Sequence, residues 1–329
     1  MRDVAIVAFA QSNCQRDAGA QNEVELIMPV LSEVFKQTGI KSAQDVDFTC
    51  SGSCDYQQGA AFAFVAGVDA LGAVPPIKES HVEMDAAWAL YEAWLKIQMG
   101  HAESALLYGF GKSSPGELPI VLSQQLDPYY LAPLWVDTIA FAAIQARTML
   151  DSGEITEADQ TAADLLKEAT YVSPLRLHDC CPISDGACAM IICTIEKAEE
   201  WGKPYAIIKG IDHRIETHHI GSRDLSRSVS TEIAGEAVGV KNGKVDVAEL
   251  YAPFSHQEII LKKALGLGDD TVINPSGGVL AGNVMMASGL SRIGEVAMRI
   301  IRGEATRGVA HATSGPCLQQ NLVTVLEAK

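Results

Sequence analysis

Two patterns of apolar positions recur along the chain, one typical of strands and one typical of helices. Short runs rich in branched residues at 4–9 and 205–210 have the length and composition of strands. A helical spacing of apolar residues follows at 86–99 and again at 289–302. Both predicted helices end at a glycine, Gly100 and Gly303, and an apolar strand begins a few residues later. The pattern predicts an α/β protein.

These elements recur in the same order at a nearly constant offset. The first strands are 201 residues apart, the segments 46–50 and 245–249 are 199 apart, and the two glycines are 203 apart. Helix–glycine–strand units also recur by chance in α/β proteins, but three matches in register favour an internal duplication. We therefore predict two halves, 1–200 and 201–329, that pack as equivalent α/β layers with parallel central strands.

The first half is longer because of residues 113–175. Turn signals flank apolar pieces there, a helical pattern covers 135–151, and a second helix within 152–171 is capped at Thr156. This segment is an insertion suited to a lid or to a subunit contact, and the sequence leaves both alternatives open.

Composition and charge narrow the class of protein. Of 329 residues, 48% are hydrophobic and 20% charged, which excludes a disordered chain, a disulfide scaffold and a coiled coil. Lys and Arg total 25 against 41 Asp and Glu, so the net charge is −16 and has the wrong sign for nucleic-acid binding. An anionic ligand such as coenzyme A would need a local basic pocket.

Cellular location is predicted from what the sequence lacks. No apolar run reaches the length of a membrane span, and no cleavage site follows the run at 4–9, so we expect neither a membrane segment nor a signal peptide. The eight cysteines have no framework spacing. We expect reduced thiols and a cytoplasmic protein.

Three motifs carry a family resemblance that extends over nearly the whole chain. They are the runs His-Asp-Cys-Cys-Pro-Ile-Ser-Asp-Gly-Ala at 178–187, Tyr-Ala-Pro-Phe-Ser at 251–255 and Asn-Pro-Ser-Gly-Gly at 274–278. In this order they resemble the thiolase superfamily, and within it the sterol-carrier-type, or lipid-transfer, thiolase-like proteins. The resemblance implies a duplicated, five-layered αβαβα fold that acts on acyl-coenzyme A, with a coenzyme A thioester as substrate and no covalently bound cofactor.

The chain departs from the thiolase pattern at the catalytic positions. Glu83 stands where the resemblance places the nucleophilic cysteine, and Tyr251 opens the run that replaces a histidine motif. Asn283 replaces another active-site histidine, and Cys317 lies close to the position of the acid/base cysteine. An acyl-enzyme needs an activated nucleophile, so these changes argue against ordinary thiolase activity.

A reaction without a covalent nucleophile fits what remains. The resemblance includes steroid side-chain aldolases, which split a β-hydroxyacyl-coenzyme A into an aldehyde or ketone and a shorter acyl-coenzyme A. Such retro-aldol cleavage needs a base and a site that stabilises the enolate. We predict Tyr251 as the base, with loop amides lowering its pKa, and His256 as the next candidate. Asn283 would bind the thioester oxygen.

Each assignment has a structural alternative. Tyr251 could be a packed aromatic, His256 a surface residue at a helix start, Asn283 a turn residue, and Glu83 a helix-capping carboxylate. The family resemblance places the loop of Asn274, Ser276, Gly277 and Gly278 beside the ligand, with the glycines allowing close approach of the backbone. The adjacent cysteines 180 and 181 cannot easily bind one tetrahedral ion, so we expect no metal.

The resemblance also implies partners. Thiolase-like chains pair through the sheet edge of the first half, so we expect at least a dimer, and the aldolases work with a small partner carrying a zinc ribbon and an oligonucleotide-binding-type (OB) fold. Two alternatives stay open: a non-catalytic subunit that pairs with a second thiolase-like chain or a zinc-ribbon protein, and an acyltransferase or thiolase that uses Cys317 or another thiol.

Overall fold

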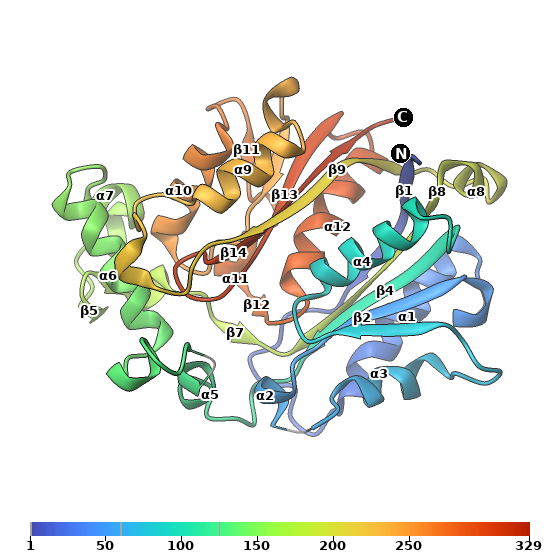
Figure 1. Cartoon of the computed structure of the whole chain (residues 1–329), viewed down its shortest axis with the longest axis horizontal. Helices are drawn as coiled ribbons and strands as arrows, with labels where there is room; N and C mark the ends of the chain where they lie inside the picture. Colours follow the sequence, from blue (N-terminus) through green and yellow to red (C-terminus); the bar gives the residue numbers. More distant parts are fainter. Residues whose placement is uncertain (1, 60, 125) are drawn as a thin grey trace.

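A single ten-stranded mixed sheet runs through the computed structural model, which describes residues 2–59, 61–124 and 126–329 (Figure 1). In spatial order its strands are β11 (Val272–Ile273), β10 (Val247–Glu249), β13 (Arg307–Ser314), β14 (Gln320–Glu327), β9 (Ala206–Ile215), β1 (Val4–Gln11), β8 (Gly186–Thr194), β4 (Ser104–Gly111), β2 (Phe48–Gly52) and β3 (Glu79–Val82). Two small ladders join β12 (Asn283–Val284) to β7 (Ile183–Ser184), and β5 (Thr170–Val172) to β6 (Leu175–Arg176).

The strand order repeats about the middle of the sheet. Outward from the centre, β1, β8, β4, β2 and β3 correspond to β9, β14, β13, β10 and β11. The two sets of five meet at a short antiparallel contact in which three residues of β1 pair with β9. The expectation of parallel central strands holds only in part. The middle strands of the two sets, β4 and β13, pair parallel with β2 and β10 but antiparallel with β8 and β14, and β1 and β9 also pair antiparallel. Within the ten-stranded sheet, parallel pairing joins β4, β2 and β3 in one set and β13, β10 and β11 in the other, where helical crossovers connect them.

Helices form three layers around the two strand sets. They are α1 (Glu23–Thr38), α2 (Asp55–Gln58), α3 (Phe64–Leu71), α4 (Ala86–Gln98), α5 (Leu118–Gln124), α6 (Thr138–Asp151), α7 (Glu157–Gln160), α8 (Ile195–Glu200), α9 (Val229–Ala237), α10 (Ser255–Leu265), α11 (Gly278–Ala281) and α12 (Ser288–Ile301). One core joins α4 and α12 to inward faces of both strand sets, a second joins α1 to the first set, and a third joins α9 and α10 to the second. The layers are therefore αβαβα.

One carboxylate joins the two central helices. Asp85 caps the start of α4 by accepting from the Ala87 N–H (2.9 Å), and it also accepts from Gly289 (2.8 Å) and Leu290 (3.1 Å) at the start of α12. Gly289 permits this approach, since a Cβ there would lie 2.5 Å from Asp85 Oδ1. The cap fixes the starts of both helices relative to each other.

The segment 113–175 contains three helices, α5 to α7, at the left-hand edge of Figure 1. The helix expected at 135–151 begins later, at Thr138, because Trp135 adopts a left-handed conformation (φ +52°) and Asp137 caps the helix. The predicted cap at Thr156 is confirmed, although α7 is only four residues long. Among the described residues, no helix combines the length and apolar character needed to cross a bilayer.

Candidate active site

Four of the five predicted catalytic residues line one cavity. Its volume is about 440 Å³, and its wall includes Glu83, Tyr251, Asn283 and Cys317. These residues come from the segment between β3 and α4, the segment after β10, β12 and the loop between β13 and β14. Residues 113–175 supply a further part of the wall through α5 and residues 137–139. The fold thus brings residues separated by more than 200 positions together.

Tyr251 begins a chain of hydrogen bonds on the cavity wall. Its hydroxyl donates to Asn283 Oδ1 (2.8 Å), and Asn283 Nδ2 donates to Cys181 Sγ (3.2 Å). Burial, and secondarily the negative charge of Asp85, raise the pKa of Tyr251 well above 10. The expectation that loop amides lower this pKa is wrong, because the hydroxyl faces a side-chain carbonyl in a buried site. Tyr251 is a neutral phenol, suited to donate a proton.

The thiols on the wall are protonated at neutral pH. Burial raises the pKa of Cys180 to about 12, that of Cys181 to about 11 and that of Cys317 to about 12. Burial also raises the pKa of Cys54, the fourth cysteine on the wall. Since the thiolate is the nucleophile, none of these four groups is activated for acyl transfer.

Two carboxylates also lie on the wall. Glu83 Oε1 accepts from the Asp55 N–H (2.6 Å), and Asp137 Oδ1 accepts from the Ala140 N–H (2.7 Å). Glu83 is exposed at the wall, whereas Asp137 is half-buried. The described wall residues include no Lys, Arg or His, so this cavity is not the local basic pocket expected for coenzyme A.

His256 does not reach the cavity. It is fully buried in α10, and its Nε2 lies 3.1 Å from Gln145 Oε1. Burial lowers its pKa to about 3, so the ring is neutral. We expected His256 to have an ordinary pKa or, alternatively, to lie on the surface. Both expectations are wrong, because packing against α6 shields the ring from water. Its neighbour Gln257 is the α10 residue on the wall.

The loop 274–278 lies behind the wall, not on it. Asn274 accepts from the Leu250 N–H (2.6 Å), next to Tyr251 in the chain. Ser276 donates to Glu249 Oε2 (2.7 Å), a carboxylate that also pairs with buried Arg292 (2.6 Å). Gly277 and Gly278 have φ values of +95° and +60°, so the glycines serve the turn. In this structure the loop supports the strand end that carries Tyr251.

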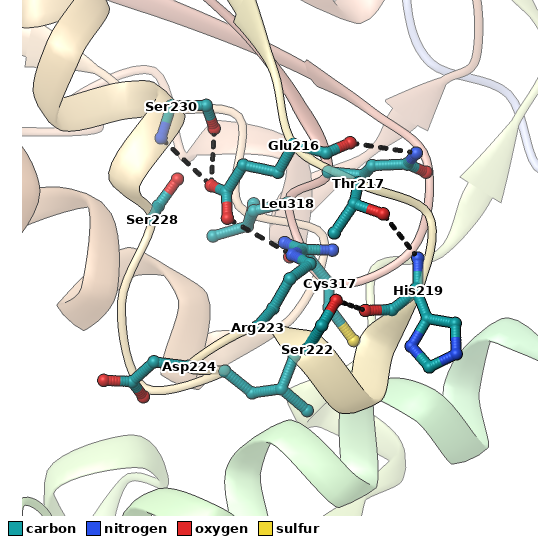
Figure 2. A network of polar contacts seen from close by, with 12 residues as sticks. Glu216, Thr217, His219, Ser222, Arg223, Asp224, Ser228, Ser230, Cys317 and Leu318 are labelled. Carbon is teal, nitrogen blue, oxygen red and sulfur yellow. Dashed lines mark hydrogen bonds and ion pairs between the residues drawn. The ribbon is translucent and has the colours of Figure 1, made fainter.

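A buried ion pair positions the loop that holds Cys317. Arg223 donates to Cys317 O (2.6 Å), and Figure 2 shows its guanidinium between that backbone and Glu216. Glu216 Oε2 accepts from Arg223 Nε (3.2 Å), and its other oxygen accepts from Ser230 Oγ (2.7 Å). Cys317 and Leu318 both have left-handed backbones, with φ of +53° and +57°. Arg223 thus holds a strained corner of the wall in place.

Comparison with known proteins assigns this architecture. No family model matches the chain. It is 31% identical over 163 residues to acetyl-CoA acetyltransferase from Methanocaldococcus jannaschii, covering 41% of this chain and 42% of that protein. It is 27% identical over 278 residues to sterol carrier protein 2 from Homo sapiens, covering 66% of this chain and 51% of that protein. The alignments thus span about half or less of these relatives.

Two solved structures superimpose on this chain over 99% or more of its length. The crystal structure of human mitochondrial 3-ketoacyl-CoA thiolase superimposes with a TM-score of 0.77 at 15% identity, covering 100% of this chain and 99% of that chain. The chain has the duplicated thiolase fold. A structure named Ltp2-ChsH2(DUF35) aldolase superimposes on it with a TM-score of 0.79 at 18% identity, covering 99% and 98% of the two chains.

The sequence interpretation missed several wall residues. Asp137 could have been found as the polar residue that precedes an apolar helical pattern, which is an N-cap signal. Cys181 lies within a motif already recognised, but its contact with Asn283 depends on the pairing of β7 with β12. Gln257 and Arg223 carry no local signal, because their roles arise only from packing between distant segments.

Proposed function

We propose that this thiolase-like protein is a carbon–carbon lyase that cleaves a β-hydroxyacyl-coenzyme A by a retro-aldol reaction. One observation carries the proposal: a neutral tyrosine and two carboxylates share a cavity whose thiols are all protonated. This set can move protons but cannot form an acyl-enzyme readily. The neighbour named Ltp2-ChsH2(DUF35) aldolase supports the same reaction class.

The reaction assigns a role to each group. A carboxylate, Glu83 or Asp137, accepts the proton of the β-hydroxyl. The bond between Cα and Cβ breaks, its electron pair moves onto the thioester to give an enolate, and Cβ becomes an aldehyde or ketone. Cα then takes a proton from the Tyr251 hydroxyl, giving the shorter acyl-coenzyme A. Asn283 orients that hydroxyl, and the carboxylate returns the proton to the tyrosine.

The substrate and the assembly are part of the proposal. A steroid side chain is the acyl group that we propose, and the apolar wall from α5 supports a bulky substrate. The structure named Ltp2-ChsH2(DUF35) aldolase pairs its thiolase-fold chain with a DUF35 protein by name, which supports a heteromeric complex with a small zinc-ribbon and OB-fold partner. We also propose a dimer, and the halves 1–200 and 201–329 as the two structural units.

Product release by mass spectrometry tests the reaction. The chain would be purified with and without a co-expressed zinc-ribbon partner and incubated with a β-hydroxyacyl-coenzyme A that bears a steroid side chain. We expect aldehyde or ketone release, reduced about 100-fold or more in Tyr251→Phe. Glu83→Gln and Asp137→Asn, compared side by side, identify the base.

The alternatives give different results. Cys317→Ala and Cys180→Ala should leave release nearly unchanged, whereas a covalent acyl adduct that either variant abolishes would indicate an acyltransferase. No release from either preparation, together with stable binding to a second thiolase-like chain, would indicate a non-catalytic subunit.

A further inference from the structure

The cavity wall carries negative charge without a compensating positive charge. Glu83 and Asp137 are its carboxylates, and its described residues include no cationic side chain. Elsewhere the wall is largely apolar, and it includes Leu122 from α5 and Ile139 from α6. An anionic group inside this cavity would therefore lose water without gaining a counter-ion.

Three buried arginines lie near the cavity, and Arg176, next to the wall residue Cys180, is already paired with Glu157. The other two cannot supply that counter-ion either. The Arg223 side chain is 3% exposed and pairs with Glu216, on the far side of the Cys317 backbone (Figure 2). Arg292 is similarly buried and pairs with Glu249. Neither residue is on the cavity wall. Both positive charges are thus neutralised before a ligand arrives.

Asp137 is the carboxylate best placed to act on a bound group. Its Oδ1 is held by the backbone at the start of α6, which fixes the side chain. Its Oδ2 makes no hydrogen bond or ion pair with any residue in the described ranges. Since Asp137 is half-buried and Glu83 is exposed, water screens the charge of Asp137 less.

We propose that this cavity selects thioesters with an uncharged acyl group and rejects acyl groups that end in a carboxylate, and that Asp137 enforces this selection. The inference rests on the proposed function, because it takes an acyl-coenzyme A as the ligand. The phosphates of coenzyme A are common to every acyl-coenzyme A, so they cancel when two acyl groups of equal length are compared. Repulsion between the partly buried Asp137 and a carboxylate on the acyl group, together with the desolvation of that acyl carboxylate, corresponds to about a 10- to 100-fold loss of affinity.

Three ligands with the same six-carbon acyl chain test the selection by isothermal titration calorimetry: hexanoyl-coenzyme A, adipyl-coenzyme A and the monomethyl ester of adipyl-coenzyme A. We expect adipyl-coenzyme A to bind the full chain at least about tenfold more weakly than the other two. Asp137→Asn should reduce that difference. Leu122→Lys, which adds a cation to the wall, should reduce it further. Asp164→Asn is the matched control, because this exposed carboxylate in the same insertion lies outside the cavity and should leave the difference unchanged.

The outcomes separate the inference from the proposed function. Equal binding of hexanoyl- and adipyl-coenzyme A overturns the inference and leaves the lyase proposal standing. A difference that Asp164→Asn reduces as much as Asp137→Asn shows a general charge effect and also overturns the assignment to Asp137. If none of the three ligands binds, the acyl-coenzyme A site itself is refuted, and the inference fails with it.

Discussion

Asp85 offers a direct test of how the two halves of the fold are joined. Its carboxylate accepts three backbone N–H groups, one at the start of α4 and two at the start of α12. In Asp85→Asn, one oxygen can still accept from Ala87 and Leu290, but the amide nitrogen faces the Gly289 N–H. One buried donor then loses its acceptor, which costs about 2 kcal/mol. Asp85→Ala leaves all three donors unpaired and should cost about 4 kcal/mol.

These two costs in the free energy of unfolding already allow for the desolvation of the Asp85 carboxylate. Burial raises the pKa of the Asp85 carboxyl even though three N–H groups and Arg292 favour its charged form. Part of the hydrogen bonding therefore offsets the cost of burying the charge, and the gross strength of three charge-assisted bonds overstates the effect. Because the folded pKa is raised, this group's contribution to the free energy of unfolding falls as pH rises from 3.8 through the folded value.

The assay is urea unfolding at pH 7 followed by circular dichroism, which gives the free energy of unfolding. We expect the order wild type, Asp85→Asn, Asp85→Ala from most to least stable. The matched control is Asp269→Asn, because Asp269 is fully exposed and pairs only with Lys262, so its midpoint should not move. An Asp85→Ala variant as stable as wild type would refute the idea that this cap holds α4 and α12 together.

Three further predictions concern buried ionisable side chains. His256 and His311 are buried, with pKa values lowered to about 3 and about 4, so the stability that they contribute above pH 6.5 is lost below that pH. We expect the free energy of unfolding to fall by about 4 kcal/mol for the pair between pH 7 and pH 5. Urea unfolding at pH 7 and at pH 5 checks this, and His256→Leu should halve the loss. Arg223→Met leaves Glu216 buried without its cation and should lower the free energy of unfolding by about 3 kcal/mol. An unchanged free energy of unfolding would show that the backbone at Cys317 keeps its conformation without Arg223. Cys181, with a pKa near 11, should react with iodoacetamide at pH 7.5 far more slowly than free cysteine, as mass spectrometry of modified peptides would show.

The repeated elements could be predicted because their signals are local. The helix expected at 86–99 is α4 (Ala86–Gln98), and Gly100 after it has the predicted left-handed backbone, with φ of +72°. The same holds for α12 and Gly303. Strand direction was predicted less well, since pairing between β1 and β8, more than 170 residues apart, leaves no mark in either segment. The division at residue 200 and the role of 113–175 remain predictions.

The sequence selected part of the cavity wall but did not predict protonation. Glu83, Tyr251, Asn283 and Cys317 came from motif order and line one cavity, whereas His256 and the loop 274–278, chosen in the same way, lie off its wall. The protonation states of Tyr251 and His256 depend on burial, which no short motif reports. Asp137 lies within residues 113–175, outside the motifs that carry the resemblance, so only the folded chain places it on the same cavity wall as Tyr251.

The helix starts explain why a proton-transfer site fits this chain better than a covalent one. An activated cysteine at the start of a helix depends on unpaired N–H groups that stabilise its thiolate. Here Asp85 already accepts from the starts of both central helices, so those donors are occupied. Glu83, at the position that the resemblance assigns to the nucleophile, is held instead by the Asp55 N–H. In Glu83→Cys, the N–H groups at the starts of α4 and α12 would still donate to Asp85 and could not stabilise a thiolate, and the negative charge of Asp85 would disfavour it. This substitution alone should therefore not give thiolase activity.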